Sequence, residues 1–578
     1  MNFRPIFPAA LLFAAGTVPA AGLTIDLRGL EGAMEENAAA YLAPIEKEET
    51  LADTRHNRAR IEDAVKKALR ALGHYEPQVR FTAGETPTGG PRLTVDVVPG
   101  TPVRLAETSV VIRGAGEKDP AFQRRLKNLP ETDTILNHGD YDAFKSSLAA
   151  VAMRKGYFDA KFLRSELGVS LPLHEAYWTI DYETGERYKF GPVTFEGSQI
   201  DEAYLRNLIP FAEGDPYHAN DLAELSRRLS ATGWFASAVV SPDFDAARES
   251  GSHALPLHAS VVPKKANSIE TGLGYATDVG PRGSVTWNKP WVNRRGHSLS
   301  STLSLSKPEQ VLDLSYKIPK RTNPLEEYWV FQGGYKHTDL NDTQSDGATL
   351  LASRWWELSD GWQRDVHVRW TYDSFTQGGE SHSTMLVYPG VSFSRTRARG
   401  GLMPHWGDSQ RYSFDVSTEY LGSDVNFFIL QAQQTWIRTY ARKHRFVVRA
   451  GAGWIKTSDF DKVPPDLRFF VGGDRSVRGY DYKSISPKDD EGKLVGAAAM
   501  ITGSLEYQFN VTGKWWGAAF FDMGEAVDAV AHSDFKRGAG VGIRWLSPVG
   551  PVKFDIARPI GDSNENDLQF YIGLGSEL

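Results

Sequence analysis

A charged, glycine-rich loop and a strand-like segment some forty residues later carry side chains that could form a specific buried ion pair. The loop is Gly472-Gly473-Asp474-Arg475-Ser476-Val477-Arg478-Gly479-Tyr480. The later segment, Phe520-x-Asp522-x-Gly524, alternates so that its three named residues share one face of a strand. An arginine that leaves bulk water needs a carboxylate, because an unpaired buried charge is costly. A loop folded back into a polar barrel interior would supply such a partner, whereas either motif taken alone is equally typical of an unrelated loop or strand in a polar protein.

The C-terminal half has the strand pattern that such an interior requires. Between residues 501 and 511 apolar and polar side chains alternate, and Glu506 falls on the polar side. About sixteen such segments lie between Asn267 and Leu578, with roughly 19 residues for each strand and its turn. Of the 15 tryptophans, 13 follow residue 266, as expected for rings at membrane interfaces. The pattern predicts a closed, 16-stranded antiparallel transmembrane β-barrel over residues 267–578.

Closure of the barrel brings its first and last strands together, because lipid cannot satisfy an open sheet edge. We expect the first strand near residues 268–277 and the last near residues 567–575. Both carry glycines, which are Gly272, Gly274, Gly573 and Gly575. Glycine packs poorly inside a strand, so one interpretation is a weak seam that opens sideways as a lateral gate. The other is that these glycines ease the curvature of the barrel.

The N-terminal half repeats a unit of about 80 residues three times. Each unit opens on a strand that ends in glycine, at Gly29, Gly114 and Gly197. Helical stretches follow and end at a second glycine, which suits a helix C-cap, and two strands complete the unit. The predicted order is β-α-α-β-β, an α+β fold with exposed edge strands. Such edges are templates for a strand from another polypeptide.

The start of the chain has the features of a secretory signal. Arg4 supplies a positive charge, Phe7 to Ala15 form a short apolar core, and small residues around Ala20 suit cleavage, so we expect residues 1–21 to be removed during export. Beyond them no run of eighteen apolar residues occurs, and mean hydropathy is −0.38. The absence of cysteine excludes disulfides and thiolate chemistry, and a net charge of −7 argues against nucleic acid as a partner.

Together with Gly540-x-Gly542-x-Arg544, the two opening motifs resemble the signature of the BamA/TamA superfamily of outer-membrane insertases. The resemblance covers essentially the whole chain after the signal. It implies that Arg478 docks inside the barrel against Asp522, with Glu506 as a second carboxylate. The implied anchor of the lumenal loop is Val477, Arg478, Gly479 and Tyr480, and its partners are Glu506, Phe520, Asp522 and Gly524.

The same resemblance extends to both ends of the chain. The repeats resemble POTRA domains, at residues 22–102, 103–187 and 188–266. The final strand resembles the β-signal by which outer-membrane proteins are recognised, with Leu568, Phe570 and Ile572 at its apolar positions. It departs from that signal in ending on a short tail instead of a terminal aromatic residue.

Three POTRA repeats make the TamA-type members of the superfamily the nearest resemblance. They imply a component of the translocation and assembly module, which helps to insert autotransporters and other β-barrel proteins. The implied partners are a TamB-like, inner-membrane-anchored periplasmic protein, unfolded outer-membrane clients and the lipid bilayer, without a cofactor. The implied location is the outer membrane of a Gram-negative bacterium, with the POTRA domains in the periplasm. A two-partner secretion transporter and a BamA-like general insertase are the alternatives.

Other classes of function find less support. An enzyme would need a nucleophile or an activated water beside a base, and neither Gly-x-Ser-x-Gly nor His-Glu-x-x-His occurs. Residues 562–566 hint at a calcium loop, but Asp567 and Gly573 stand where a glycine and a bidentate acid should be. The histidines of the repeats, His74 among them, lack ligand spacing and are interpreted as surface residues. We expect neither catalysis nor a metal site, and a passive pore would not need the repeats.

Overall fold

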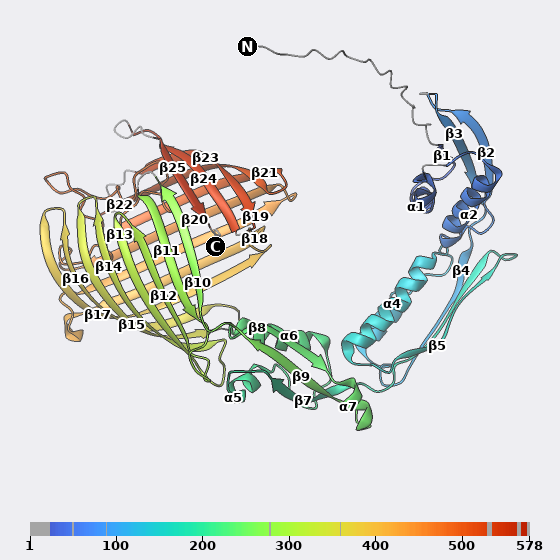
Figure 1. The fold of residues 1–578 in the computed structure, drawn as a ribbon, viewed down its shortest axis with the longest axis horizontal. Helices are drawn as coiled ribbons and strands as arrows, with labels where there is room; N and C mark the ends of the chain where they lie inside the picture. The colour runs from blue at the N-terminus through green and yellow to red at the C-terminus, as the bar shows by residue number, and fades with distance from the viewer. Residues whose placement is uncertain are drawn as a thin grey trace, which may run out of the picture. The chain divides into compact units, whose positions relative to one another are not determined.

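Three small sheets and one closed barrel make up the described chain (Figure 1). The computed structural model describes residues 23–48, 51–87, 89–276, 279–358, 360–528, 535–548, 550–562 and 568–574. The predicted signal, residues 1–21, lies outside them. The chain divides into two units, of which the second comprises residues 193–210, 223–241 and 258–578, so the third repeat contributes to both. Among the described residues, no helix combines the length and the apolar character needed to cross a bilayer.

The first repeat has the predicted order of elements. It consists of β1 (Thr24–Arg28), α1 (Ala33–Glu46), α2 (Arg55–Ala71), β2 (Gln78–Glu85) and β3 (Pro91–Val98), with sheet order β1-β3-β2. The hydroxyl of Thr54 caps α2 by accepting the N–H of Asn57 at 3.1 Å. One face of α2 buries Ile61, Val65 and Leu69 in a core formed by residues 23–97 alone.

The second repeat follows the same plan with a separate core. It consists of β4 (Arg104–Arg113), α3 (Pro120–Leu126), α4 (His138–Lys155), β5 (Lys161–Ser170) and β6 (Glu175–Glu183), with sheet order β4-β6-β5. Helix α4 ends at Gly156, whose φ of 84° is left-handed, and the next residue, Tyr157, folds into the core.

The prediction that the histidines of the repeats lie at the surface was wrong for His74 of the first repeat. This side chain is buried, with Nδ1 3.2 Å from the carbonyl oxygen of Gly100.

The third repeat departs from the predicted order. It consists of β7 (Lys189–Glu196), α5 (Glu202–Leu205), η1 (Arg206–Leu208), α6 (Ala219–Ala231), β8 (Phe235–Pro242), α7 (Phe244–Glu249) and β9 (Ala254–Pro263), with sheet order β7-β9-β8. Its first helix is short because Ile209 precedes Pro210 and is extended, with ψ 122°. The additional helix α7 is capped by the carboxylate of Asp243, which accepts the N–H of Ala246 at 2.9 Å.

The predicted barrel is confirmed, and its described residues form sixteen strands in which each pairs antiparallel with the next. They are β10 (Ser268–Ala276), β11 (Gly280–Lys289), β12 (Ser298–Ser306), β13 (Glu309–Pro319), β14 (Glu327–Leu340), β15 (Thr343–Glu357), β16 (Gln363–Gln377), β17 (Glu380–Arg399), β18 (Trp406–Ser417), β19 (Phe427–Tyr440), β20 (His444–Thr457), β21 (Ala499–Thr512), β22 (Trp515–Val527), β23 (Lys536–Ser547), β24 (Gly550–Pro559) and β25 (Gln569–Leu574), with a short helix η2 (Glu419–Leu421) in one turn. Along β21, Ile501 and Leu505 are exposed outside while Ser504 and Glu506 are buried inside. This alternation gives the barrel an apolar exterior and a polar interior.

Parts of the third repeat pack against the turns at one end of the barrel. The indole N–H of Trp234 donates to the carbonyl oxygen of Gly296 at 2.9 Å, and Arg294 pairs with Asp201 at 2.8 Å. Residue 296 lies in the turn between β11 and β12. Because consecutive strands run antiparallel, the turns after β13, β15, β17 and β19 lie at the same end of the barrel. These contacts identify the end of the barrel that contacts the third repeat.

Candidate functional site at the barrel seam

The first and last barrel strands are joined by a very short ladder. In the described residues β10 and β25 pair only at Tyr275 with Ile572 and at Ala276 with Tyr571. By comparison β10 pairs with β11 at nine positions, and β24 pairs with β25 at six. Residues 268–274 of β10 thus have no described partner on the β25 side. An unpaired strand edge is a template for another strand.

The glycines predicted at this seam lie around one cavity. Gly272, Gly274 and Gly573 line a space of about 430 Å³ together with Arg282 and Asp474. Gly575 lies outside the described residues, as do Thr277 and Asp567 at the predicted strand ends. The space lies beside the loop that bears the charged motif, so the loop tip and the seam belong to one site.

The tip of that loop, which we call the lumenal loop (residues 458–498), places its arginine in the predicted position. Arg478 is 2% exposed and donates from Nε to Asp522 at 2.7 Å and from Nη2 to the same carboxylate at 3.0 Å. Its Nη1 donates to Glu506 at 2.9 Å. The guanidinium also lies over the ring of Phe520, 3.3 Å from the ring centroid. A bidentate pair and a stacked ring fix both the position and the plane of the arginine.

Two further residues complete the cluster, and the sequence did not indicate their role. Asp555 on β24 accepts from Arg478 at 3.3 Å and from Arg544 on β23 at 2.5 Å. Arg544 also donates to Glu506 at 2.7 Å. The buried cluster therefore holds two arginines and three carboxylates, contributed by the loop and by β21 to β24. Arg544 ends the Gly540-x-Gly542-x-Arg544 motif, and alternation along β24 was the available signal for Asp555.

Glycines allow the loop to lie directly on the barrel wall. A Cβ at Gly538 of β23 would overlap the carbonyl oxygen of Arg478, so only glycine leaves room for this approach. Gly524 lies against the side chain of Val477, where an added Cβ would be 3.0 Å from Cγ2. Gly479 has a φ of 102°, which other residues rarely adopt. The glycines of these motifs thus serve the docking of the loop.

The loop also contacts both sides of the seam. On the β25 side the N–H of Gly479 donates to the hydroxyl of Tyr571 at 3.1 Å. Gln569 donates to Asp481 at 2.7 Å. On the other side Asp474 pairs with Arg282 of β11 at 3.4 Å. Because Tyr571 is itself one of the two residues of β25 that pair with β10, a change in the loop acts directly on the seam.

The apolar positions of the predicted β-signal lie on the exterior face of β25, opposite the face that contacts the lumenal loop. Phe570 and Ile572 of β25 and the preceding Leu568 are all exposed on the exterior, whereas Tyr571 points inward and is buried. One face of β25 thus meets lipid, and the other holds the lumenal loop.

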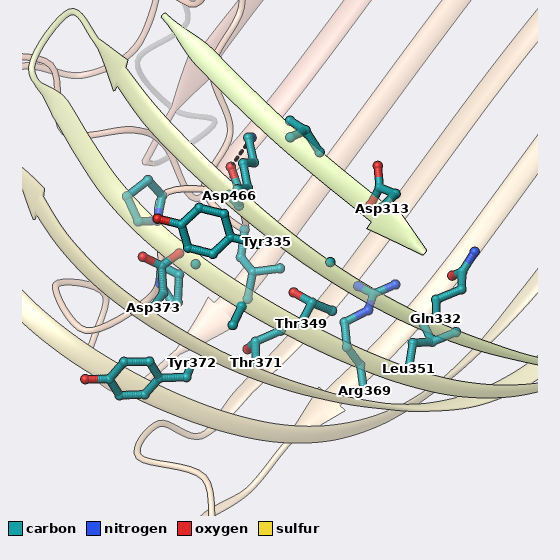
Figure 2. Close-up of a pocket in the computed structure, with 18 of the residues that line it drawn as sticks. Asp313, Gln332, Tyr335, Thr349, Leu351, Arg369, Thr371, Tyr372, Asp373 and Asp466 are labelled. Atoms are coloured by element: carbon teal, nitrogen blue, oxygen red, sulfur yellow. Dashed lines mark hydrogen bonds and ion pairs between the residues drawn. The ribbon is translucent and has the colours of Figure 1, made fainter. Parts of the chain in front are cut away.

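A polar chamber occupies another part of the barrel interior. It has a volume of about 860 Å³, and Figure 2 shows Asp313, Gln332, Thr349, Arg369 and Asp373 among its lining residues. Asp466 of the lumenal loop forms an ion pair there with Lys336 of β14 at 2.7 Å. The loop is therefore fastened to the wall on this side as well. Within the described chain, no group of three or more His, Asp or Glu side chains is arranged to hold a metal ion.

Comparison with known proteins places this geometry in a family. The model of the Omp85 superfamily domain matches residues 264–578, more than half of the chain. A model described as POTRA domain TamA domain 1 matches residues 24–99, and a POTRA model described as surface antigen variable number repeat matches residues 188–263.

Individual relatives are more distant. The outer membrane protein assembly factor BamA of Nitratidesulfovibrio vulgaris is 24% identical over 420 residues, which are 65% of this chain and 49% of that protein. BamA of Neisseria meningitidis is 24% identical over 245 residues, 35% of this chain and 30% of that protein. The chain thus spans about half the length, or less, of these curated relatives.

Likeness to a solved structure supports the same architecture. The crystal structure of BamA from Haemophilus ducreyi lacking POTRA domains 1–3 has a TM-score of 0.66 at 16% identity, and covers 81% of this chain and 99% of that one. At this identity the likeness concerns the fold. With its barrel matched by the family model and its first and third repeats matched by POTRA models, the chain belongs to the Omp85 superfamily, as a Gram-negative outer-membrane protein whose POTRA domains lie in the periplasm.

Proposed function

We propose that this protein is the outer-membrane component of a TamA-type translocation and assembly module, which helps autotransporters and other β-barrel proteins to insert into the outer membrane. Insertion takes place at a lateral gate between β10 and β25. The role involves no catalysis and no cofactor. The driving force is the folding of the client, whose backbone groups must all be paired within lipid.

The short seam is the observation that carries this proposal. Among the described residues, two residues of β10 pair with β25, and residues 268–274 have no described partner on that side. Ile269 and Leu273 of this stretch are exposed. A client strand that pairs along β10 replaces the backbone hydrogen bonds that opening the seam removes. The lumenal loop, which contacts Tyr571, is positioned to hold β25 in place during this exchange.

The TamA-type assignment rests on the repeats. The chain carries three repeats, each with its own three-stranded sheet, whereas a two-partner secretion transporter carries two, and the first repeat matches the model of TamA domain 1. We further propose that a TamB-like, inner-membrane-anchored protein docks on these POTRA domains, using an edge strand as its template.

An insertion assay tests the proposed activity. Full-length protein in liposomes should speed the appearance of heat-resistant, folded β-domain from a urea-denatured autotransporter, compared with empty liposomes. The matched control is a 16-stranded porin without repeats, reconstituted at the same density. Equal rates with the protein, with the porin and with empty liposomes would contradict the proposal.

Deleting residues 23–102 tests the docking of the partner. The core of the first repeat is formed by residues 23–97, and the second repeat has its own core, so the shortened protein should still fold and insert. We expect it to lose the inner-membrane partner in crosslinked pull-downs from intact envelopes, while full-length protein retains it. Recovery of the partner in undiminished yield would show that the first repeat is not its docking site.

A further inference from the structure

A group of arginines and tryptophans lies on the outer face of the barrel at its periplasmic end. These residues come from the ends of β14 to β19 and from one adjoining turn, at the end of the barrel that contacts the third repeat. We call them the arginine–tryptophan belt, which consists of Arg354, Arg364, Arg395, Arg397, Arg399, Arg438, Trp329, Trp356, Trp362 and Trp406. In the order of the sixteen strands, β17 and β18 are the eighth and ninth, so the belt lies across the barrel from the seam.

Strand alternation shows that the belt faces outward. On β16, Arg364 shares its face with Val366 and Val368, which are exposed to the exterior. On β17, Arg395 and the arginines after it share the face of the exposed Phe393. Across the strands Trp406 pairs with Arg399 on one side and with Arg438 on the other, so all three share one face.

Within the belt each tryptophan carries one or more guanidinium groups on its ring. Arg364 lies 4.1 Å from the ring centroid of Trp356, and Arg395 lies 4.6 Å from that of Trp362. Trp406 carries three arginines, at centroid distances of 4.7 to 5.5 Å. Stacking of this kind holds a guanidinium in a fixed plane and leaves its N–H edge available.

The belt has more positive charge than its carboxylates neutralise. Asp408 accepts both bonds of a bidentate pair from Arg397, at 3.0 and 2.9 Å, and lies 3.8 Å from Arg438. Glu327 pairs with Arg354 at 3.2 Å but also with Lys320. These two carboxylates therefore leave part of the belt without a counter-charge.

Three arginines of the belt, Arg364, Arg395 and Arg399, have no carboxylate partner in the described part of the chain, and Arg395 instead donates to Gln410 at 3.3 Å. Arg399 contacts Trp406 through its cation–π interaction alone, and Arg364 likewise contacts Trp356. The Nε–H of Arg364 is buried and has no hydrogen-bond acceptor among the described residues.

Elsewhere on the same rim tryptophans occur without arginines. Trp515 and Trp545 on β22 and β23 stack at a centroid distance of 5.5 Å and are exposed, and no guanidinium group of the described residues lies over either ring. Such a pair is an ordinary membrane-interface girdle. Stacked arginines with excess charge are specific to β14 to β19.

We infer that the arginine–tryptophan belt binds the phosphate of an anionic phospholipid in the periplasmic leaflet of the outer membrane. Tryptophan rings lie at the depth of the headgroups, which places the guanidinium groups beside the lipid phosphates. The guanidinium fork suits two phosphate oxygens at once, and basic clusters at this depth attract anionic lipids. A lipid bound here contacts the wall across from the seam and leaves the seam itself free.

The test compares phosphatidylglycerol with zwitterionic phosphatidylcholine as added probes, using the purified full-length protein in a neutral detergent and native mass spectrometry. We expect wild-type protein to retain phosphatidylglycerol in preference to phosphatidylcholine. The double variant Arg364→Gln with Arg399→Gln should bind phosphatidylglycerol about tenfold more weakly or worse, because each interfacial arginine contributes to attraction of an anionic lipid. The double variant Arg364→Lys with Arg399→Lys keeps the positive charges but lacks the planar guanidinium groups, and should bind phosphatidylglycerol with intermediate strength.

Arg537→Gln is the matched control, because Arg537 is an exposed arginine at the other end of β23. It should bind phosphatidylglycerol like the wild type. Equal retention of both lipids by the wild type, or undiminished phosphatidylglycerol binding by the double glutamine variant, would overturn the inference. Displacement of the lipid by millimolar inorganic phosphate would also overturn it, since it would indicate a site for a free anion. If the double variant does not show a folded, heat-modifiable band, Arg399→Gln alone is scored against the same criteria.

Discussion

Replacing Arg478 with alanine should lower the temperature at which the folded barrel converts to the slower-migrating form on unboiled gels. The variant leaves three buried carboxylates, Glu506, Asp522 and Asp555, facing the single arginine Arg544. Breaking a buried charge pair by removing one partner costs about 3–5 kcal/mol. The loss also removes the contact that holds the loop tip on the wall, so insertion of client proteins should fall with it.

Three further variants separate the charge of Arg478 from its geometry. Lysine at this position keeps the charge but not the bidentate fork, and should recover part of the heat resistance. The double variant Arg478→Asp with Asp522→Arg should also recover only part of the heat resistance, because its guanidinium group lies on β22 and its carboxylate lies on the loop. Arg475→Ala is the matched control, because it removes an exposed arginine of the same loop. If Arg478→Ala has wild-type mobility and wild-type insertion activity, the cluster does not anchor the loop.

The pairing of Arg478 with Asp522 was implied by the resemblance to the family, and the residues of each motif are consistent with it. A lone arginine between glycine and valine needs a partner on leaving water, and alternation on the later strand directs one carboxylate to the interior. The barrel was predictable for a similar reason, since a period of two repeated over about 300 residues has few other solutions in lipid. The β-α-α-β-β order of the first two repeats could be predicted from the regular recurrence of strand, glycine and helix.

What could not be predicted depends on contacts between distant strands. Alternation along β24 indicates that Asp555 faces the interior, but its place in the cluster depends on the lumenal loop folding back against β21 to β24. The register of β10 on β25 is likewise fixed by closure, so the sequence could place glycines near the seam without revealing that Tyr275 faces Ile572. In the belt the tryptophans were visible as an interface signal, but the register that stacks Arg399 and Arg438 on Trp406 was not.

Locking the seam should abolish insertion of client proteins without unfolding the barrel. The chain has no cysteine, so a disulfide between Tyr275→Cys and Ile572→Cys would be the only one present. These residues are direct partners across the seam, and both side chains face the exterior. Directly opposed residues bring their Cβ atoms to about 4.5–5.5 Å, which small backbone shifts reduce to bridging distance. The other pair, Ala276 with Tyr571, is less suitable because the hydroxyl of Tyr571 holds Gly479 of the lumenal loop.

A disulfide within the wall provides the matched control for the seam. Thr271 and Val285 are direct partners on β10 and β11, so Thr271→Cys with Val285→Cys constrains the first strand without joining it to the last. The control should insert clients equally well when oxidised and when reduced. The seam variant should be inactive when oxidised and regain activity on reduction, because a client strand can replace β25 along β10 only when the two strands separate. If the oxidised seam variant inserts clients as fast as its reduced form, β10 and β25 merely close the barrel, and the client strand must enter the membrane elsewhere.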